Sequence, residues 1–141
     1  MFLNQLSVFL ENREGRLDQV LNTLRNNGIN IVSLSLADTS DYGMLRMIVA
    51  NPETAKAVLR EAGFSAMLTP VMGVKLAHKA GSLQECLSEL SKEGINIEYM
   101  YAFSQGDAAN VIIRPDNIEK CADVLKANKL ELIAASELYK L

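Results

Sequence analysis

The 141-residue chain contains two copies of one sequence pattern. Residues 15–31 align without gaps with residues 81–97, and both stretches end in Gly-Ile-Asn-Ile. The same offset of 66 residues pairs Asn51 with Asn117 farther along the chain. A repeat of this length indicates a duplicated folding unit. Two domains are therefore predicted, residues 1–69 and residues 70–141, with the joint near Thr69-Pro70.

The hydrophobic pattern of the first copy changes its period along the chain. Apolar and polar residues alternate around Val8, which predicts a half-buried strand. From Leu17 to Leu24 the apolar residues recur at helical spacing, which predicts a helix that ends at Gly28. The β-branched runs, the turn near residues 38–41 and the Asn51-Pro52 helix start define the other elements. These are strands at 29–37 and 44–49, a helix from residue 52, and a closing strand at 64–69.

The second copy predicts the same elements, with two differences in detail. Its third strand is expected to be short, residues 110–113, because Pro115 interrupts it. Its closing strand is expected at residues 130–138. The order β-α-β-β-α-β occurs twice, which predicts an α+β fold of two tandem ferredoxin-like domains, each an antiparallel sheet with both helices on one face.

Composition and charge exclude several classes of protein. The chain has 14 Lys and Arg against 17 Asp and Glu, so no basic surface for nucleic acid is indicated. No apolar run is long enough to cross a bilayer, and residues 1–5 do not resemble a secretion signal. We expect a cytoplasmic protein that binds neither nucleic acid nor membrane. Cys86 and Cys121 are far apart in sequence and are expected in the core.

The loops between the first strand and first helix of each copy are the best candidates for a site. Gly15 and Gly81 lie just before a helix, where free backbone N–H groups and the helix dipole favour an anion such as a carboxylate. The alternative is that each glycine only makes a tight turn. His78 is the only histidine, and no nucleophile motif or pair of metal-binding cysteines is present. We expect no catalysis, no metal and no cofactor.

The loop, the helix and the Asn-Gly-Ile-Asn-Ile segment that starts at Asn27 resemble the ACT domain, a small regulatory module of amino-acid metabolism. The resemblance covers essentially the whole chain, as two tandem copies. In that family, the first loop and an asparagine at the start of the second strand bind an amino acid at the contact between two domains. Glu14 and Ala80 depart from the family, which often has Pro there, and His78 replaces Asn12.

The resemblance implies a set of ligand-binding residues in both copies. They are Asn12, Arg13, Glu14, Gly15, Arg16, Leu17, Asn30, Ile31, His78, Lys79, Ala80, Gly81, Ser82, Leu83, Asn96 and Ile97. Alternatives remain open: Asn30 and Asn96 could satisfy the backbone at a strand start, and His78 and the Arg13 and Lys79 charges could contact only water.

The expected function is non-catalytic amino-acid binding that regulates a separate enzyme of amino-acid metabolism. The first alternative is a small acylphosphatase-type enzyme, which would need an Arg such as Arg13 to hold phosphate and an Asn such as Asn30 to orient water. The second is a structural interaction module with empty loops. The aromatic residues Tyr99, Tyr101 and Phe103 share a strand face, so a homo-oligomer is expected as well.

Overall fold

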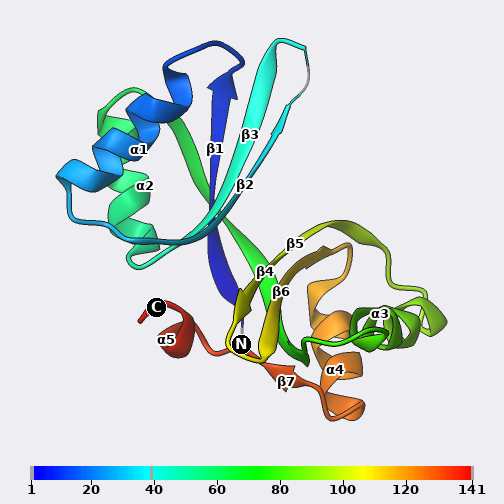
Figure 1. Ribbon diagram of the computed structural model, residues 1–141. Helices are drawn as coiled ribbons and strands as arrows, with labels where there is room; N and C mark the ends of the chain where they lie inside the picture. The colour runs from blue at the N-terminus through cyan, green and yellow to red at the C-terminus, as the bar shows by residue number, and fades with distance from the viewer. Residues whose placement is uncertain (1, 39, 141) are drawn as a thin grey trace. The chain divides into compact units, whose positions relative to one another are not determined.

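The computed structural model describes residues 2–38 and 40–140, and it has the predicted mixed fold, with the β-α-β-β-α order in both copies (Figure 1). The first copy comprises β1 (Leu3–Glu11), α1 (Arg16–Asn26), β2 (Ile31–Asp38), β3 (Tyr42–Val49), α2 (Pro52–Glu61) and the start of β4 (Ser65–Ala77). The second copy comprises the rest of β4, α3 (Ser82–Lys92), β5 (Ile97–Gln105), β6 (Ala108–Pro115), α4 (Ile118–Ala127), β7 (Glu131–Leu132) and α5 (Ala135–Leu138).

The helices form where the sequence places apolar residues at helical spacing. Val20 and Leu24 are buried on α1, and their counterparts Cys86 and Leu90 are buried on α3. Pro52 occupies the first turn of α2, where its missing N–H costs nothing. The Asn117 side chain accepts a hydrogen bond from the Lys120 N–H at 3.0 Å and so caps α4.

The strands pair in the same antiparallel way in both copies. In the first, the neighbours run in the order β2-β3-β1-β4, and in the second they run β7-β4-β6-β5. Val8 faces Leu45 across β1 and β3, and Val74 faces Val111 across β4 and β6. Both second strands carry an irregularity in register near their start, before Ser33 and before Tyr99. The duplication therefore extends to local backbone geometry.

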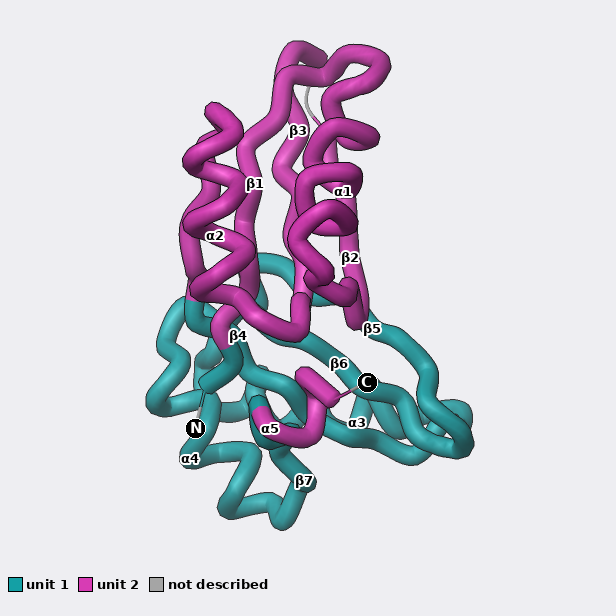
Figure 2. The backbone as a smooth tube through the Cα atoms, turned by 90° about the vertical axis from the view of Figure 1, so that its left-hand side faces the viewer, with its two compact units in different colours: residues 1–3, 70–135 teal, residues 4–69, 136–141 magenta. Residues whose placement is uncertain are grey.

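The chain divides into two compact units that exchange their ends. One unit consists of the first residues up to Leu3 and of Pro70–Ala135, and the other consists of Asn4–Thr69 and the segment from Ser136 onward (Figure 2). The boundary falls inside β4, so the expected closing strand of the first copy and the opening strand of the second are one strand of 13 residues. β4 is therefore an element that both units need.

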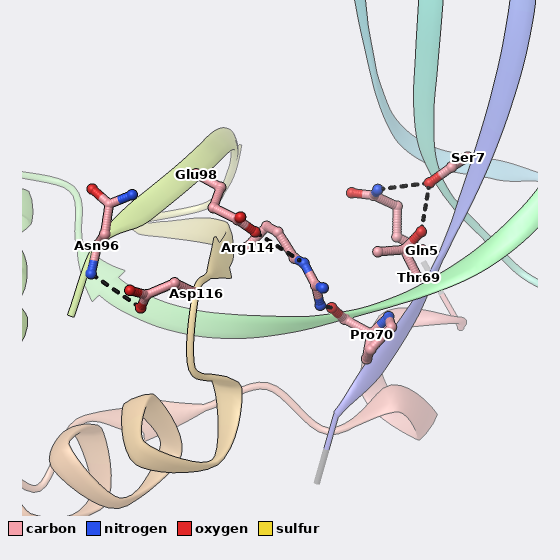
Figure 3. Close-up of polar contacts among 8 residues, drawn as sticks. All are labelled: Gln5, Ser7, Thr69, Pro70, Asn96, Glu98, Arg114 and Asp116. Carbon is pink, nitrogen blue, oxygen red and sulfur yellow. Dashed lines mark hydrogen bonds and ion pairs between the residues drawn. The ribbon is translucent and has the colours of Figure 1, made fainter.

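Polar contacts hold β4 on both sides of this boundary (Figure 3). Ahead of it, the Thr69 hydroxyl lies 2.9 Å from that of Ser7, which accepts a hydrogen bond from Gln5 Nε2 at 3.0 Å. Beyond it, Arg114 Nη1 donates to the Pro70 carbonyl at 2.7 Å and pairs with Glu98 at 3.5 Å. These contacts satisfy polar groups around the middle of the strand.

Two expectations for the second copy are wrong. The strand expected at 130–138 is limited to β7, after which residues 135–138 form the short helix α5. Ala135, Glu137 and Leu138 are good helix formers, and α5 buries Leu138. The third strand is also not shortened, because Pro115 is the last residue of β6, and β6 is as long as β3, at 8 residues.

Each unit has its own core under its helices. Figure 1 shows α1 and α2 on the same side of the first-copy strands, where Leu24 and Leu59 belong to one cluster of buried side chains. The corresponding cluster of the second copy includes Leu90 and Leu125. Within the described residues, no helix has the length and apolar character needed to span a membrane.

The two cysteines lie in the second core, as expected. Cys86 is 1% exposed and Cys121 is fully buried, and both are free thiols. Burial, with smaller contributions from Cys86 and Asp116, raises the pKa of the Cys121 thiol to about 11. Burial also raises the pKa of Cys86.

We therefore expect both thiols to be unreactive in the folded protein. At pH 8, a thiol with a pKa near 11 is ionised in roughly one molecule in a thousand, so a thiol-specific chromophore should react only after unfolding in urea. Because unfolding lowers the Cys121 pKa towards 9.0, stability should fall as the pH rises from about 9 to about 11. The double variant Cys86→Val with Cys121→Ala carries the residues that the first copy has at these positions. Its stability should decrease less between about pH 9 and about pH 11 than that of the wild type. Rapid reaction of the folded protein would contradict the prediction.

Candidate functional site

The two candidate loops have the same backbone structure. The Asn12 N–H donates to the Asp41 carbonyl at 2.8 Å, and the His78 N–H donates to the Asp107 carbonyl at 3.0 Å. Each loop ends in a glycine that precedes the helix in the left-handed region, with φ of 86° at Gly15 and 89° at Gly81. A side chain at either position would be strained, although a Cβ there would meet no atom within 4 Å.

The first turns of α1 and α3 expose backbone donors beside these glycines. Unlike α4, neither helix has a side-chain cap among the described residues. The Arg16 N–H reaches the Arg13 carbonyl only at 3.4 Å, and the Ser82 N–H reaches the Lys79 carbonyl at 3.3 Å. Such helix starts are suited to an anion, because the N–H groups point outward at the positive end of the helix dipole.

The side chains of the first loop are partly engaged with one another. Asn12 Nδ2 lies 3.4 Å from both Asp38 Oδ2 and the Ser40 carbonyl, and Arg13 pairs with Glu11 at 3.3 Å. Glu14 is exposed. Asn12, Arg13 and Leu17 line a small cavity of about 50 Å³ within this unit. The first loop therefore brings together three of the expected residues.

The second loop is more open than the first. His78, Lys79 and Ala80 are exposed, and within the described part of the chain the His78 side chain makes no hydrogen bond or ion pair. Gly81 and Leu83 line a groove of about 750 Å³ along α3. Among the described residues, the second loop thus keeps the backbone hydrogen bond to its neighbouring hairpin but lacks side-chain contacts like those that Asn12 makes to Asp38 and Ser40.

Asn96 has a side chain that the fold does not use. Its backbone is paired with Asp116, because the Asn96 N–H donates to Asp116 Oδ1 at 3.1 Å and the Asp116 N–H donates to the Asn96 carbonyl at 3.0 Å. Figure 3 shows its amide group pointing away from Asp116, and it has no hydrogen-bond partner among the described residues. A role for this side chain in satisfying the strand start is therefore not observed.

The other strand-start residues contribute to the structure. The Asn30 carbonyl accepts a hydrogen bond from the Ala50 N–H at 2.9 Å. Ile31 and Ile97 pack against the cores of their own units. Both isoleucines therefore have a packing role directly after the candidate asparagines.

Arg16 and Ser82, which occupy matching positions, behave differently. The Arg16 guanidinium stacks over the Phe64 ring at 4.7 Å, and Nη1 donates to Gln19 Oε1 at 2.6 Å. Ser82 lines a cavity of about 630 Å³ in its own unit, together with Glu85 and other residues that were not expected from the sequence. These cavity-lining residues could have been found in the sequence by comparing the residues at matching positions of the two copies.

The loop arginine bears on the acylphosphatase-type alternative. Such a site needs an arginine that holds phosphate, and Arg13 is ion-paired with Glu11 at 3.3 Å on the surface of the first loop. No group of three or more potential metal-binding side chains is present in residues 2–38 and 40–140. The uncapped helix starts are suited to binding a small anion.

Comparisons with known proteins agree with this description. The model of the ACT domain pair family matches residues 1–141. Protein BT0572 from Bacteroides thetaiotaomicron is 45% identical and has a TM-score of 0.96, with 100% of this chain and 98% of that chain covered. A search of curated protein sequences returns no match.

Two regulatory subunits of aspartate kinase share the fold at low identity. The one from Thermus thermophilus is 18% identical with a TM-score of 0.64, over 89% of this chain and 93% of that chain. The one from Thermus flavus is 17% identical with a TM-score of 0.61, over 97% of this chain and 94% of that chain.

Proposed function

This chain belongs to the ACT domain family as a pair of ACT domains, and from that premise we propose that it is a non-catalytic regulatory protein that binds a small amino acid. The observation that carries the proposal is the matched pair of loops, each with a left-handed glycine before an uncapped helix. Exposed N–H groups at such a turn suit the α-carboxylate of an amino acid. The Asn96 amide can serve as a further polar contact.

The resemblance to the family supports binding where one ACT domain meets another. The proposed ligand residues are the loop and strand-start positions named from that resemblance, with Asn12 and Gly15 in one loop and His78 and Gly81 in the other. Ile31 and Ile97 act by holding the asparagines in place. The change from Asn12 to His78 makes the two sites chemically different, so we propose that they differ in affinity.

We further propose that the ligand acts on a separate enzyme of amino-acid metabolism. A ligand that binds one arrangement of the domains more tightly shifts the population towards it. When the free ligand is present at 100 times its dissociation constant, it stabilises the arrangement that it binds by about 2.7 kcal/mol. That the regulatory subunits of aspartate kinase share the fold supports a partner of this kind.

The first test is a thermal shift measurement of the whole protein against the twenty amino acids. A ligand that binds only the folded state must raise the melting temperature. A shift with none of them would favour the structural module, and hydrolysis of an acyl phosphate would favour the enzyme.

Substitution of the strand asparagines gives a sharper test. We expect Asn96→Ala and Asn30→Ala each to weaken one site by about 1 to 3 kcal/mol, or about fivefold or more, because each removes a hydrogen bond to a buried ligand group. Calorimetry of each variant measures this loss. The exposed Asn26→Ala is the matched control and should bind as the wild type does. Two identical sites that neither substitution affects would argue against these residues.

A further inference from the structure

The second copy contains a cavity that lies on a different side of α3 from the groove lined by Gly81 and Leu83. It has a volume of about 630 Å³ and is bounded by the start of α3, the end of β4 and the turn between α4 and β7. Ser82, Glu85 and Glu89 project into it from one face of α3, whereas Leu83 and Leu87 line the groove on the opposite face. The cavity and the groove are therefore separate surfaces of one unit.

The matching place in the first copy is filled by the protein's own arginine. The Arg16 guanidinium covers the Phe64 ring at 4.7 Å and donates to Gln19 at 2.6 Å. In the second copy, the repeat replaces Arg16 by Ser82 and Phe64 by Leu130, and both smaller residues line the cavity. The two smaller residues therefore leave open, at these positions, space that an arginine side chain and a phenyl ring occupy in the other copy.

The hydrogen-bond acceptor for that guanidinium is retained and becomes charged. Glu85 stands where the first copy has Gln19, the residue that Arg16 contacts. Within the described residues, the Glu85 carboxylate has no hydrogen bond or ion pair, while the neighbouring Glu89 is paired with Lys92 at 3.1 Å. A carboxylate binds a guanidinium more strongly than an amide oxygen does.

Two lysines supply positive charge at the same cavity. Lys79 and Lys129 line it and have no ion-pair partner in the part of the chain that the structure describes, whereas Lys75 lies 3.9 Å from Glu131. Lys129 has φ of 58°, the only positive value outside glycine among the described residues, and the first copy has Gly63 there. A side chain other than glycine is strained in this region. The strained residue stands at the position that brings a cation to the cavity.

We propose that this cavity binds a small molecule that carries a guanidinium or ammonium group at one end and a carboxylate at the other, the chemistry of a free basic amino acid. The cationic end takes the place of the Arg16 guanidinium and bonds to Glu85. The carboxylate end lies towards Lys79 and Lys129. This site adjoins the loop site and shares Lys79 and Ser82 with it, whereas Glu85 and Lys129 belong to this cavity alone.

Calorimetry of the whole protein with L-arginine tests the proposal. We expect arginine to bind, and L-citrulline, which has the same shape without the positive charge, to bind at least tenfold more weakly. Agmatine, which lacks the carboxylate, should also bind more weakly. Glu85→Gln should weaken arginine binding at least tenfold, because a hydrogen bond between charged groups is replaced. The matched change Gln19→Glu in the filled copy should leave it unchanged.

A second variant rebuilds the first-copy filling in the second copy. Ser82→Arg with Leu130→Phe should abolish arginine binding while the protein still melts in a sharp transition. Absence of arginine binding to the wild type, or unchanged binding in Glu85→Gln and in the filled variant, would overturn the proposal. If Asn96→Ala removes arginine binding and Glu85→Gln does not, the ligand is at the loop site, so the proposed function stands and this inference fails.

Discussion

Dividing the chain between Thr69 and Pro70 is expected to leave neither half with a stable fold. The cut falls in the middle of β4, which both units use, and it separates each unit from an end segment. Leu3, 1% exposed, belongs to the unit of Pro70–Ala135, and Leu138, also 1% exposed, belongs to the unit of Asn4–Thr69. A domain of about 70 residues has little stability to spare.

Circular dichroism of the two fragments during heating measures the effect. Residues 1–69 and residues 70–141 should each lack a cooperative transition, or should associate with themselves. A fragment of residues 1–77, which keeps the whole of β4, is the control and should retain more structure than residues 1–69. A monomeric half that melts as sharply and at as high a temperature as the whole chain would contradict the shared role of β4.

Truncation of matched core leucines should have the next largest effect. Leu24 on α1 is 0% exposed and Leu90 on α3 is 1% exposed, and they occupy equivalent positions in the two cores. We expect Leu24→Ala and Leu90→Ala each to lower the free energy of unfolding by about 2 to 5 kcal/mol, because each leaves a cavity that the neighbours fill only in part.

Urea titration gives this loss as a shift in midpoint with little change in slope. Leu83→Ala, on the same helix as Leu90 but 39% exposed, is the control and should cost well under half as much. Equal losses in Leu83→Ala and Leu90→Ala would mean that the α3 core is not packed as described. If only one of Leu24→Ala and Leu90→Ala lowered the free energy of unfolding by this amount, only one of the two cores would be packed as described.

The elements that the sequence predicted well are those with a strong local signal. The spacing from Leu17 to Leu24 and the glycine after it define α1, and the same pattern defines α3. Apolar residues at this spacing lie on one face of a helix, so the pattern predicts the helix without knowledge of distant parts of the chain. The order of strands in a ferredoxin-like unit then follows from the order of elements.

The errors lie where local signals compete with tertiary structure. Thr69-Pro70 has the composition of a joint, yet β4 continues through it, and the Pro70 carbonyl is bonded to the distant Arg114. Residues 130–138 carry enough apolar residues for a strand, but the last hydrogen bond to β4 within the described residues is that of the Ile133 N–H to the Gly73 carbonyl, and the chain then forms α5. Neither contact is visible from neighbouring residues alone.

Much of the candidate site was visible in the sequence, because glycines before helices and repeated asparagines are local features. The cavity of the second copy was not, because it depends on the direction of side chains. Only the structure shows that Arg16 turns inward over Phe64, so that its replacement by Ser82 leaves a space. The sequence shows that Ser82 replaces Arg16 and Leu130 replaces Phe64 in the second copy, but it does not show that these replacements open a cavity.

The exchange of end segments between the units has a consequence for how the gene can change. Recombination between its two similar halves would delete one repeat length and yield a shorter chain. In that chain, Leu3 would have lost Gly73, beside which it lies, and β4 would no longer run from one unit into the other. Such deletions are expected to be eliminated by selection for folding. The two copies are then inherited together and can diverge, one keeping its arginine and the other its cavity.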